Sequence, residues 1–142
     1  MEDPFATSAT VKVCFLIYTH DLNTTLISNL LELQPSNVKP YQPLINNDNE
    51  KANATSWIIE TPEEISHDIN DQLSQLISLL ADKKEIIRSL KKQYNTNHEF
   101  RIIIKMKNED KCGLKPAKGF DHKTLTFIND IYAKIMFDQY II

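Results

Sequence analysis

Glycine is almost absent from this chain: Gly113 and Gly119 are the only two among 142 residues. Glycine is the residue that most readily adopts positive φ, which tight turns and phosphate-binding loops require. The sequence therefore lacks the glycine-rich signatures of dinucleotide-binding and nucleotide-phosphate loops. It is also unfavourable for β-sandwiches, whose many tight turns use such residues.

The composition predicts one ordinary domain spanning residues 1–142, because 42% of the residues are hydrophobic and a chain of this length buries roughly 70% of its unfolded surface. We expect residues 1–9 to be disordered and residues 46–53 to form a mobile loop. The acidic N-terminus lacks a signal-peptide core, and no apolar run approaches the ~20 residues of a membrane span. A cytoplasmic protein without membrane contact follows, and the abundance of Ile, Lys and Asn is typical of an AT-rich bacterial genome.

Charge is distributed unevenly along the chain. Residues 1–80 carry 3 basic and 11 acidic side chains, a net charge of −8, whereas residues 81–142 carry 13 basic and 8 acidic side chains, a net charge of +5. A compact domain with this pattern has a charge dipole that steers partners, unless the two halves mix in space and cancel it.

The first half of the chain predicts three strands and a helix. Residues 10–19 are apolar on both faces, as in a central strand. Asn23 is placed to cap a helix that ends before Pro35. Residues 38–45 are expected to form an edge strand, where prolines are tolerated, and residues 55–60 form the next strand, which carries Trp57.

A capping box with proline at the first helical position, residues 61–64, predicts that the next helix begins at Pro62. Its apolar face starts at Ile65 and continues to Tyr94. An unbroken helix of that length would measure ~50 Å. A domain of this size is only about 37 Å across. We therefore expect a break near residues 81–84, which divides the region into two helices.

The last third of the chain predicts a strand, then a helix and then a second strand. Residues 99–107 alternate, with Phe100 on the core side and Arg101, Lys105 and Lys107 on the other. Asp121 is expected to cap a helix, and residues 134–142 to form the terminal strand. That strand should direct Phe137 and Ile141 towards the helices. Its carboxylate Asp138 and Tyr140 then share the opposite face, where Arg101 and Lys105 are the best candidates to pair with Asp138.

This order of elements begins with the β-α-β-β-α-β series of ferredoxin-like folds and adds one helix and one strand. The predicted fold class is α+β, a ferredoxin-like-derived sandwich. Its sheet is mixed or antiparallel, has four or five strands, and carries the helices on one face. The other face is expected to be at least partly open.

Several motifs, in this order and at this spacing, match a known family. They are the run Leu31-Glu32-Leu33-Gln34-Pro35-Ser36, the strand tryptophan, the two-part helical region, the basic strand and the ending Phe137-Asp138-Gln139-Tyr140. The chain resembles the small bacterial family called domain of unknown function forty-two seventy-nine over residues 10–142. The resemblance implies a fold but no activity and no catalytic residues. Family members often have glycine before the strand tryptophan and before the last strand, and this chain has glycine at neither place.

Motifs for catalysis, metals and cofactors are not found. The four histidines fall in separate segments, and none has a zinc-helix partner. The sequence Ser66-His67-Asp68 contains the residue types of a catalytic triad. Consecutive helical residues point about 100° apart, however, so these three side chains cannot relay a proton. We therefore predict no catalytic residues, no metal and no cofactor, which favours a non-enzymatic protein without excluding an enzyme. Cys14, which lies inside an apolar strand, is expected to be buried, and this favours packing over nucleophilic chemistry.

Binding to a protein partner is the leading functional interpretation, and an immunity protein that neutralises a bacterial toxin is its most concrete form. Nucleic-acid binding is not predicted, because the chain is acidic overall and its strand aromatics point away from the strand cations. The alternatives are a small-ligand-binding protein or enzyme with a pocket near Trp57, and a homodimer joined through sheet faces or edge strands. The candidate partner-binding residues are Trp57, Arg101, Lys105, Lys107, Asp138 and Tyr140.

Overall fold

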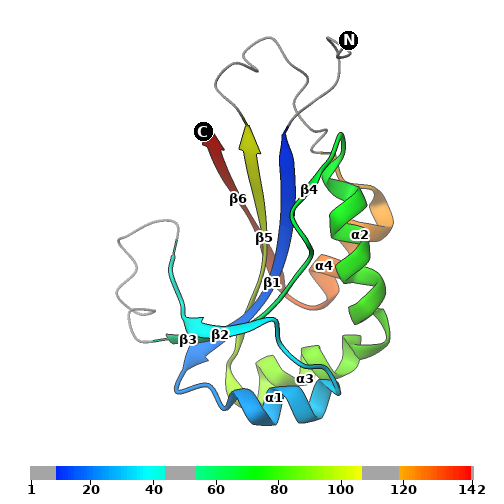
Figure 1. Ribbon diagram of the computed structural model, residues 1–142. Coiled ribbons are helices and arrows are strands. Elements are labelled where there is room, and N and C mark those ends of the chain that lie inside the picture. Colours follow the sequence, from blue (N-terminus) through cyan, green and yellow to red (C-terminus); the bar gives the residue numbers. More distant parts are fainter. Residues whose placement is uncertain (1–8, 44–53, 107–118, 142) are drawn as a thin grey trace, which may run out of the picture.

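A computed structural model describes residues 9–43, 54–106 and 119–141. One sheet of six strands forms one layer, and helices cover one of its faces (Figure 1). The strands are β1 (Thr10–His20), β2 (Asn37–Pro40), β3 (Ala54–Glu60), β4 (Glu64–Ile65), β5 (Asn97–Met106) and β6 (Ala133–Ile141). The helices are α1 (Thr24–Leu31), α2 (Ile69–Leu80), α3 (Lys84–Tyr94) and α4 (His122–Asp130), with the 3₁₀ turn η2 (Ala81–Lys83) between α2 and α3.

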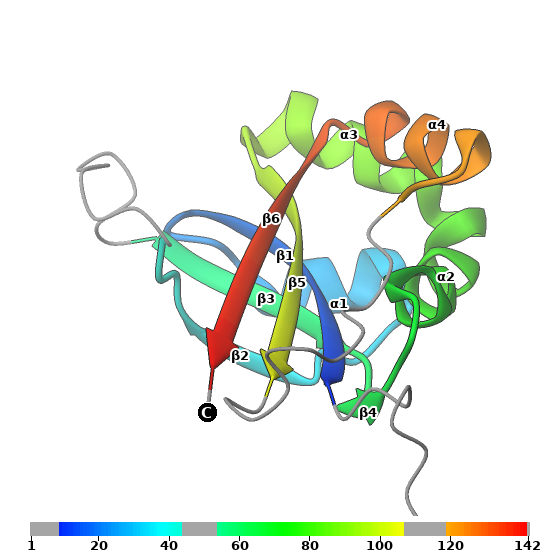
Figure 2. The same cartoon turned by 90° about the horizontal axis from the view of Figure 1, so that it is seen from above.

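The strand order β2-β3-β1-β5-β6 confirms the predicted fold class. The neighbours from β2 to β5 are antiparallel, as in the ferredoxin-like series, and β6 adds a parallel strand next to β5 (Figure 2). β4 pairs with the start of β1, where β3 no longer reaches, and brings the sheet to six strands. The sheet is therefore mixed and has one strand more than expected.

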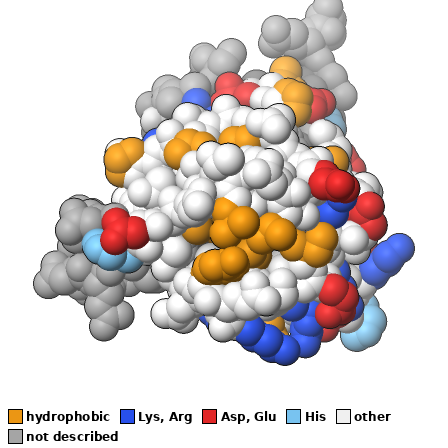
Figure 3. All heavy atoms as spheres, turned by 90° about the horizontal axis from the view of Figure 1, so that it is seen from below, with side chains coloured by type: hydrophobic (Ala, Val, Ile, Leu, Met, Phe, Trp, Pro, Cys, Tyr) orange, Lys and Arg blue, Asp and Glu red, His pale blue; other side chains and the backbone are white. Residues whose placement is uncertain are grey.

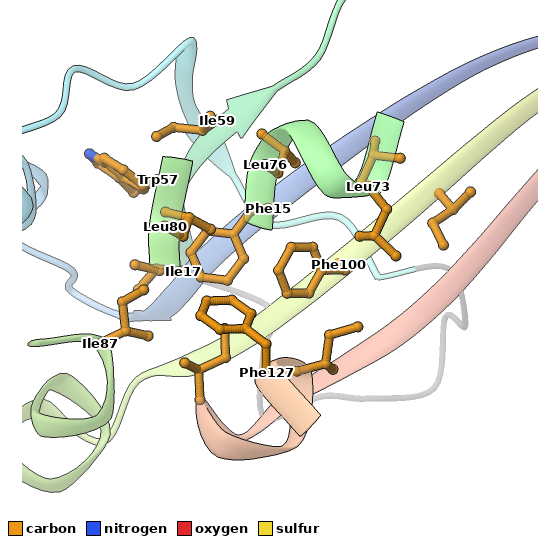
Figure 4. Packing of buried hydrophobic residues seen from close by; sticks show 14 of the residues in the cluster. Phe15, Ile17, Trp57, Ile59, Leu73, Leu76, Leu80, Ile87, Phe100 and Phe127 are labelled. Carbon is orange, nitrogen blue, oxygen red and sulfur yellow. The ribbon is translucent and has the colours of Figure 1, made fainter. Parts of the chain in front are cut away.

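The core lies between the sheet and the helices and draws on alternate residues of the central strands. Phe15 of β1 and Phe100 of β5 are directly opposite in the register, and their ring centroids are 5.0 Å apart. Leu73 and Leu80 of α2 pack on this face and are fully buried (Figure 4). Burying one such side chain contributes about 1.5–3 kcal/mol, so this interface is the main stabilising contact of the fold.

The helix boundaries agree with the sequence at most capping positions. Asn23 and Asp121 accept hydrogen bonds from the backbone amides of Leu26 and Thr124, as expected of N-caps. The break between α2 and α3 falls at η2, within the predicted range.

The predicted capping box at residues 61–64 is wrong. Thr61 is buried, and its Oγ1 accepts the amide of Val13 at 3.0 Å instead of capping a helix. Glu64 pairs with Val11 in β4, and α2 begins only at Ile69, capped by Asp68. The open edge of β1 therefore holds this segment extended, because strand pairing satisfies more backbone groups than the local helical cap would.

Candidate functional site

The face of the sheet opposite the helices carries a second, smaller apolar cluster. Its buried members share this side of β1, β3 and the segment that follows β2: Cys14, Leu16, Tyr18, Tyr41, Ala54 and Ile58. Tyr41 lies over the sheet, and its ring stacks on that of Tyr18 with centroids 3.8 Å apart. This face is therefore partly covered near β3 and uncovered towards β6.

A buried carboxylate, Glu99, organises the polar side chains of this face. Its side chain is 0% exposed, and Oε2 lies 2.7 Å from Nε of Arg101. Oε1 accepts the phenol of Tyr41 at 2.9 Å and lies 3.5 Å from Nζ of Lys134 on β6. A buried charge is tolerated only when it is paired and hydrogen-bonded. Glu99 therefore joins β5, β6 and the segment after β2 in one network.

The aromatic rings of the second cluster extend this network. Arg101 lies over the ring of Tyr41 at 5.5 Å, and Lys134 lies over the ring of Tyr18 at 5.6 Å, both within cation–π range. Burial, the hydrogen bond with Tyr18 and the charge of Glu99 raise the pKa of the Tyr41 phenol well above its ordinary value. Tyr41 therefore stays protonated and remains a hydrogen-bond donor to Glu99.

A hollow of about 190 Å³ opens next to this network, between the sheet and residues 37–42. Its cationic lining groups are Lys12, Lys39 and Arg101, and its acidic ones are Glu60 and Asp138. Lys12 is paired with Glu60 at 3.5 Å. The remaining lining residues are Cys14, Leu16, Asn37, Gln42, Ile58, Ile103 and Tyr140.

Two cations of the hollow have unused hydrogen-bonding capacity. Nη2 of Arg101 is buried and has no hydrogen-bond partner among the residues that the structure describes, although Nε of the same guanidinium is bound to Glu99. Lys39, which lies on the exposed strand β2, forms no ion pair with any residue that the structure describes. A buried donor without an acceptor costs about 1–3 kcal/mol, and the guanidinium that carries this donor lines the hollow. The hollow is therefore suited to a carboxylate or a similar anion.

The thiol of Cys14 faces this hollow but is not a reactive nucleophile. The residue is 6% exposed, and Sγ lies 3.7 Å from Oε2 of Glu60. Burial, aided by the negative charge of Glu60, raises the pKa of Cys14 to about 11. Since the thiolate is the nucleophilic form, the neutral thiol packs as a small apolar side chain, as expected from the sequence.

The structure brings three of the predicted binding residues, Arg101, Asp138 and Tyr140, to one hollow. Asp138 does not form the expected ion pair with Arg101 or Lys105, because these cations pair with Glu99 and with Glu63 at 3.0 Å. The phenol of Tyr140 donates to Asp138 at 2.5 Å instead, and this hydrogen bond raises the pKa of Tyr140.

Of the remaining three candidates, Trp57 and Lys105 do not line the hollow. Trp57 is 0% exposed and points to the helices, where its Nε1 donates to Oγ of Ser28 at 3.0 Å (Figure 4). It therefore belongs to the core, and it does not line the hollow. Lys107 lies outside the described residues.

Sequence reasoning did not identify Glu99, Lys39 or Tyr41. The position of Glu99 was a usable signal, since it shares the parity of Arg101 in a strand that is otherwise apolar and basic. Lys39 and Tyr41 share one face of the edge strand expected over residues 38–45, but this segment has no clear alternation of apolar and polar residues to show which face of the sheet that is.

A second hollow lies on the opposite side, where α1 and α3 meet the end of β1. It has a volume of about 280 Å³ and is lined by Leu22, Leu26, Ile27 and Tyr94 together with polar residues 19–21 and 23. Seen from this side, hydrophobic side chains gather at the centre, and basic side chains lie along one margin (Figure 3). Its charged lining residues, His20 and Asp21, have exposed side chains.

The other side chains that could bind a metal or transfer a proton form no site among the described residues. No cluster of three or more metal-ligating side chains occurs within residues 9–43, 54–106 and 119–141. His98 is buried, and its Nδ1 donates to the carbonyl of Ile131 at 2.6 Å while Nε2 accepts from Oγ1 of Thr96 at 2.8 Å. In the same residues, none of the helices has the length and apolar character needed to cross a membrane.

Comparison with known proteins places the chain in a family. The model of the family described as Domain of unknown function (DUF4279) matches residues 9–142. The chain belongs to this family. Its resemblance to the DUF4279 family is thereby confirmed over almost the whole sequence. No curated protein and no solved structure matches the chain. Membership in DUF4279 assigns no activity to the chain.

Proposed function

We propose that this DUF4279 domain is a non-catalytic binding module that holds a protein partner against the uncovered face of its sheet. The observation that supports this most directly is the pair of cations that line the hollow: Lys39, and Arg101, whose buried Nη2 has no hydrogen-bond partner among the described residues. A carboxylate from an acidic side chain of the partner would pair with the guanidinium of Arg101 and with Lys39. Such charge-assisted contacts orient a partner and accelerate its association.

The size of the hollow favours a protein side chain over a free small molecule. Pockets for small-molecule ligands are usually about 300–1,000 Å³. A volume of about 190 Å³ is better suited to one Asp or Glu side chain that projects from a larger surface. The uncovered part of the sheet around the hollow, including Ile103 and Tyr140, would supply the remaining contact area.

An immunity protein in the bacterial cytoplasm is the most concrete form of this proposal. It would act by occlusion, covering an acidic region of a toxin without any chemical step. The absence of a metal cluster among the described residues and the unreactive thiol of Cys14 are compatible with this role.

The test is affinity capture from cells of the native host with a matched pair of variants. Lys39→Glu reverses a charge at the hollow, whereas Lys92→Glu reverses an exposed charge on α3, far from the hollow. We expect a protein partner that is retained by the wild type and by Lys92→Glu and is lost from Lys39→Glu. Recovery of no partner, or equal recovery by both variants, would contradict the proposal. Circular dichroism verifies that both variants are folded.

A further inference from the structure

The last strand, β6, is a long edge strand whose outer side has no partner strand among the described residues. It runs for nine residues from Ala133 to Ile141 and pairs only with β5. Phe137 and Ile141 on its helix side are 36% and 70% exposed. An edge of this length presents a row of free amides and carbonyls that can pair with another strand.

Two opposite charges on β6 are arranged symmetrically about its centre. Lys134 and Asp138 lie two residues before and two residues after Met136, and all three side chains share the uncovered face of the sheet. If two copies of β6 pair antiparallel with Met136 on the twofold axis, Lys134 of each copy lies opposite Asp138 of the other. Opposite charges in this position attract, whereas like charges would repel.

The same register also matches the apolar side chains on the helix side. It places Ile135 opposite Phe137 of the second copy, next to the edge of each core. A shift of one residue would bring the uncovered face of one copy onto the helix side of the other. A shift of two residues retains the faces but separates Lys134 from Asp138. Only the register centred on Met136 satisfies both the charges and the faces.

We infer that the protein forms a homodimer through antiparallel pairing of its β6 strands about Met136, which joins the two sheets into one. Asp138 lines the hollow of its own protomer, so the partner subunit's Lys134 reaches the edge of that hollow. Each hollow then gains a cation from the second copy. The dimer thereby reinforces the preference for an acidic group, and its formation does not depend on the proposed protein partner.

Charge reversal tests the register by sedimentation velocity at two widely separated protein concentrations. We expect the wild type to dimerise. Asp138→Lys alone and Lys134→Glu alone should each raise the dimer dissociation constant about tenfold or more, because two cross-strand pairs become repulsive. A mixture of the two variants restores both attractions and should dimerise. Since Lys134 also contacts Glu99, circular dichroism has to show that Lys134→Glu is folded.

A disulfide provides a second measurement that does not rely on charge. Residues at the twofold axis of an antiparallel pair have Cα atoms about 4.5–5.5 Å apart, which a disulfide can span. In a Cys112→Ser background, Met136→Cys should give a covalent dimer under mild oxidation. The control Tyr140→Cys should not, because its two copies would lie roughly 27 Å apart along the strands. A monomer at both concentrations, or a dimer that Cys at 136 does not cross-link, would overturn the inference.

Discussion

The buried histidine of β5 predicts a specific dependence of stability on pH. His98 is 2% exposed, and burial lowers its pKa from 6.5 to about 4, with a smaller contribution in the same direction from Lys91. Its Nδ1 donates to the carbonyl of Ile131, and its Nε2 accepts from Thr96. The ring is therefore neutral in the folded protein at physiological pH.

The sign and size of the effect follow from proton linkage. Below pH 6.5 the unfolded chain binds a proton at His98 that the folded protein does not bind until the pH approaches 4. The stability contributed by His98 is therefore present above pH 6.5 and is lost as the pH falls towards 4. Each pH unit inside this window changes the free energy of unfolding by up to about 1.4 kcal/mol. Between pH 8 and pH 5 the loss is about 2 kcal/mol.

The measurement is urea unfolding at a series of pH values, with a variant that cannot titrate at this position. His98→Asn retains a donor for the carbonyl of Ile131 but has no ionisable group. Between pH 8 and pH 5 its free energy of unfolding should therefore fall by about 2 kcal/mol less than that of the wild type. His20→Asn, at an exposed position, is the control and should keep the wild-type slope. Identical pH profiles for wild type and His98→Asn would refute the reasoning.

Three further changes probe the uncovered face. Arg101→Leu removes the ion-pair partner closest to the buried Glu99, so it should lower the free energy of unfolding by about 3–5 kcal/mol in urea titrations. A loss below about 1 kcal/mol would contradict the network. Asp138→Asn should cost less than about 1 kcal/mol in the same assay at a protein concentration below the dimer dissociation constant. Within one protomer Asp138 is half-buried and has no ion pair among the described residues, so only the hydrogen bond from Tyr140 changes. Cys14, with a pKa of about 11, should resist an aromatic disulfide reagent at pH 8 until urea unfolds the protein, and fast labelling of the native Cys14 thiol would show that it is not buried.

Much of the fold could be predicted because its strongest signals agree with one another. The alternation of β5 and the caps at Asn23 and Asp121 gave the correct elements, since each local preference is also satisfied in the tertiary structure. The capping box at residues 61–64 failed for the opposite reason. The partner that holds Thr61 is Val13, 48 residues earlier, and a local motif contains no information about such a distant contact.

The candidate site was predictable only where strand periodicity fixes the facing direction. Arg101, Asp138 and Tyr140 were placed correctly on one face because side chains alternate along a strand. The ion pair expected between Arg101 and Asp138 did not form, since Glu99 is closer on the same strand and is fully buried. Which of several cations a carboxylate meets depends on strand order and on rotamers, and neither can be read from one sequence.

The scarcity of glycine has a consequence for the unfolded chain. Four described positions with positive φ are occupied by residues other than glycine: Asp21, Glu32, Asn95 and Tyr132. A side chain in this conformation costs roughly 1–2 kcal/mol in the folded state. A glycine there would remove the strain but would give the unfolded chain more conformations to lose on folding. At these four positions, backbone strain in the native state is exchanged for lower conformational entropy in the unfolded chain. Part of their contribution to stability therefore comes from the unfolded state and not from contacts in the folded one.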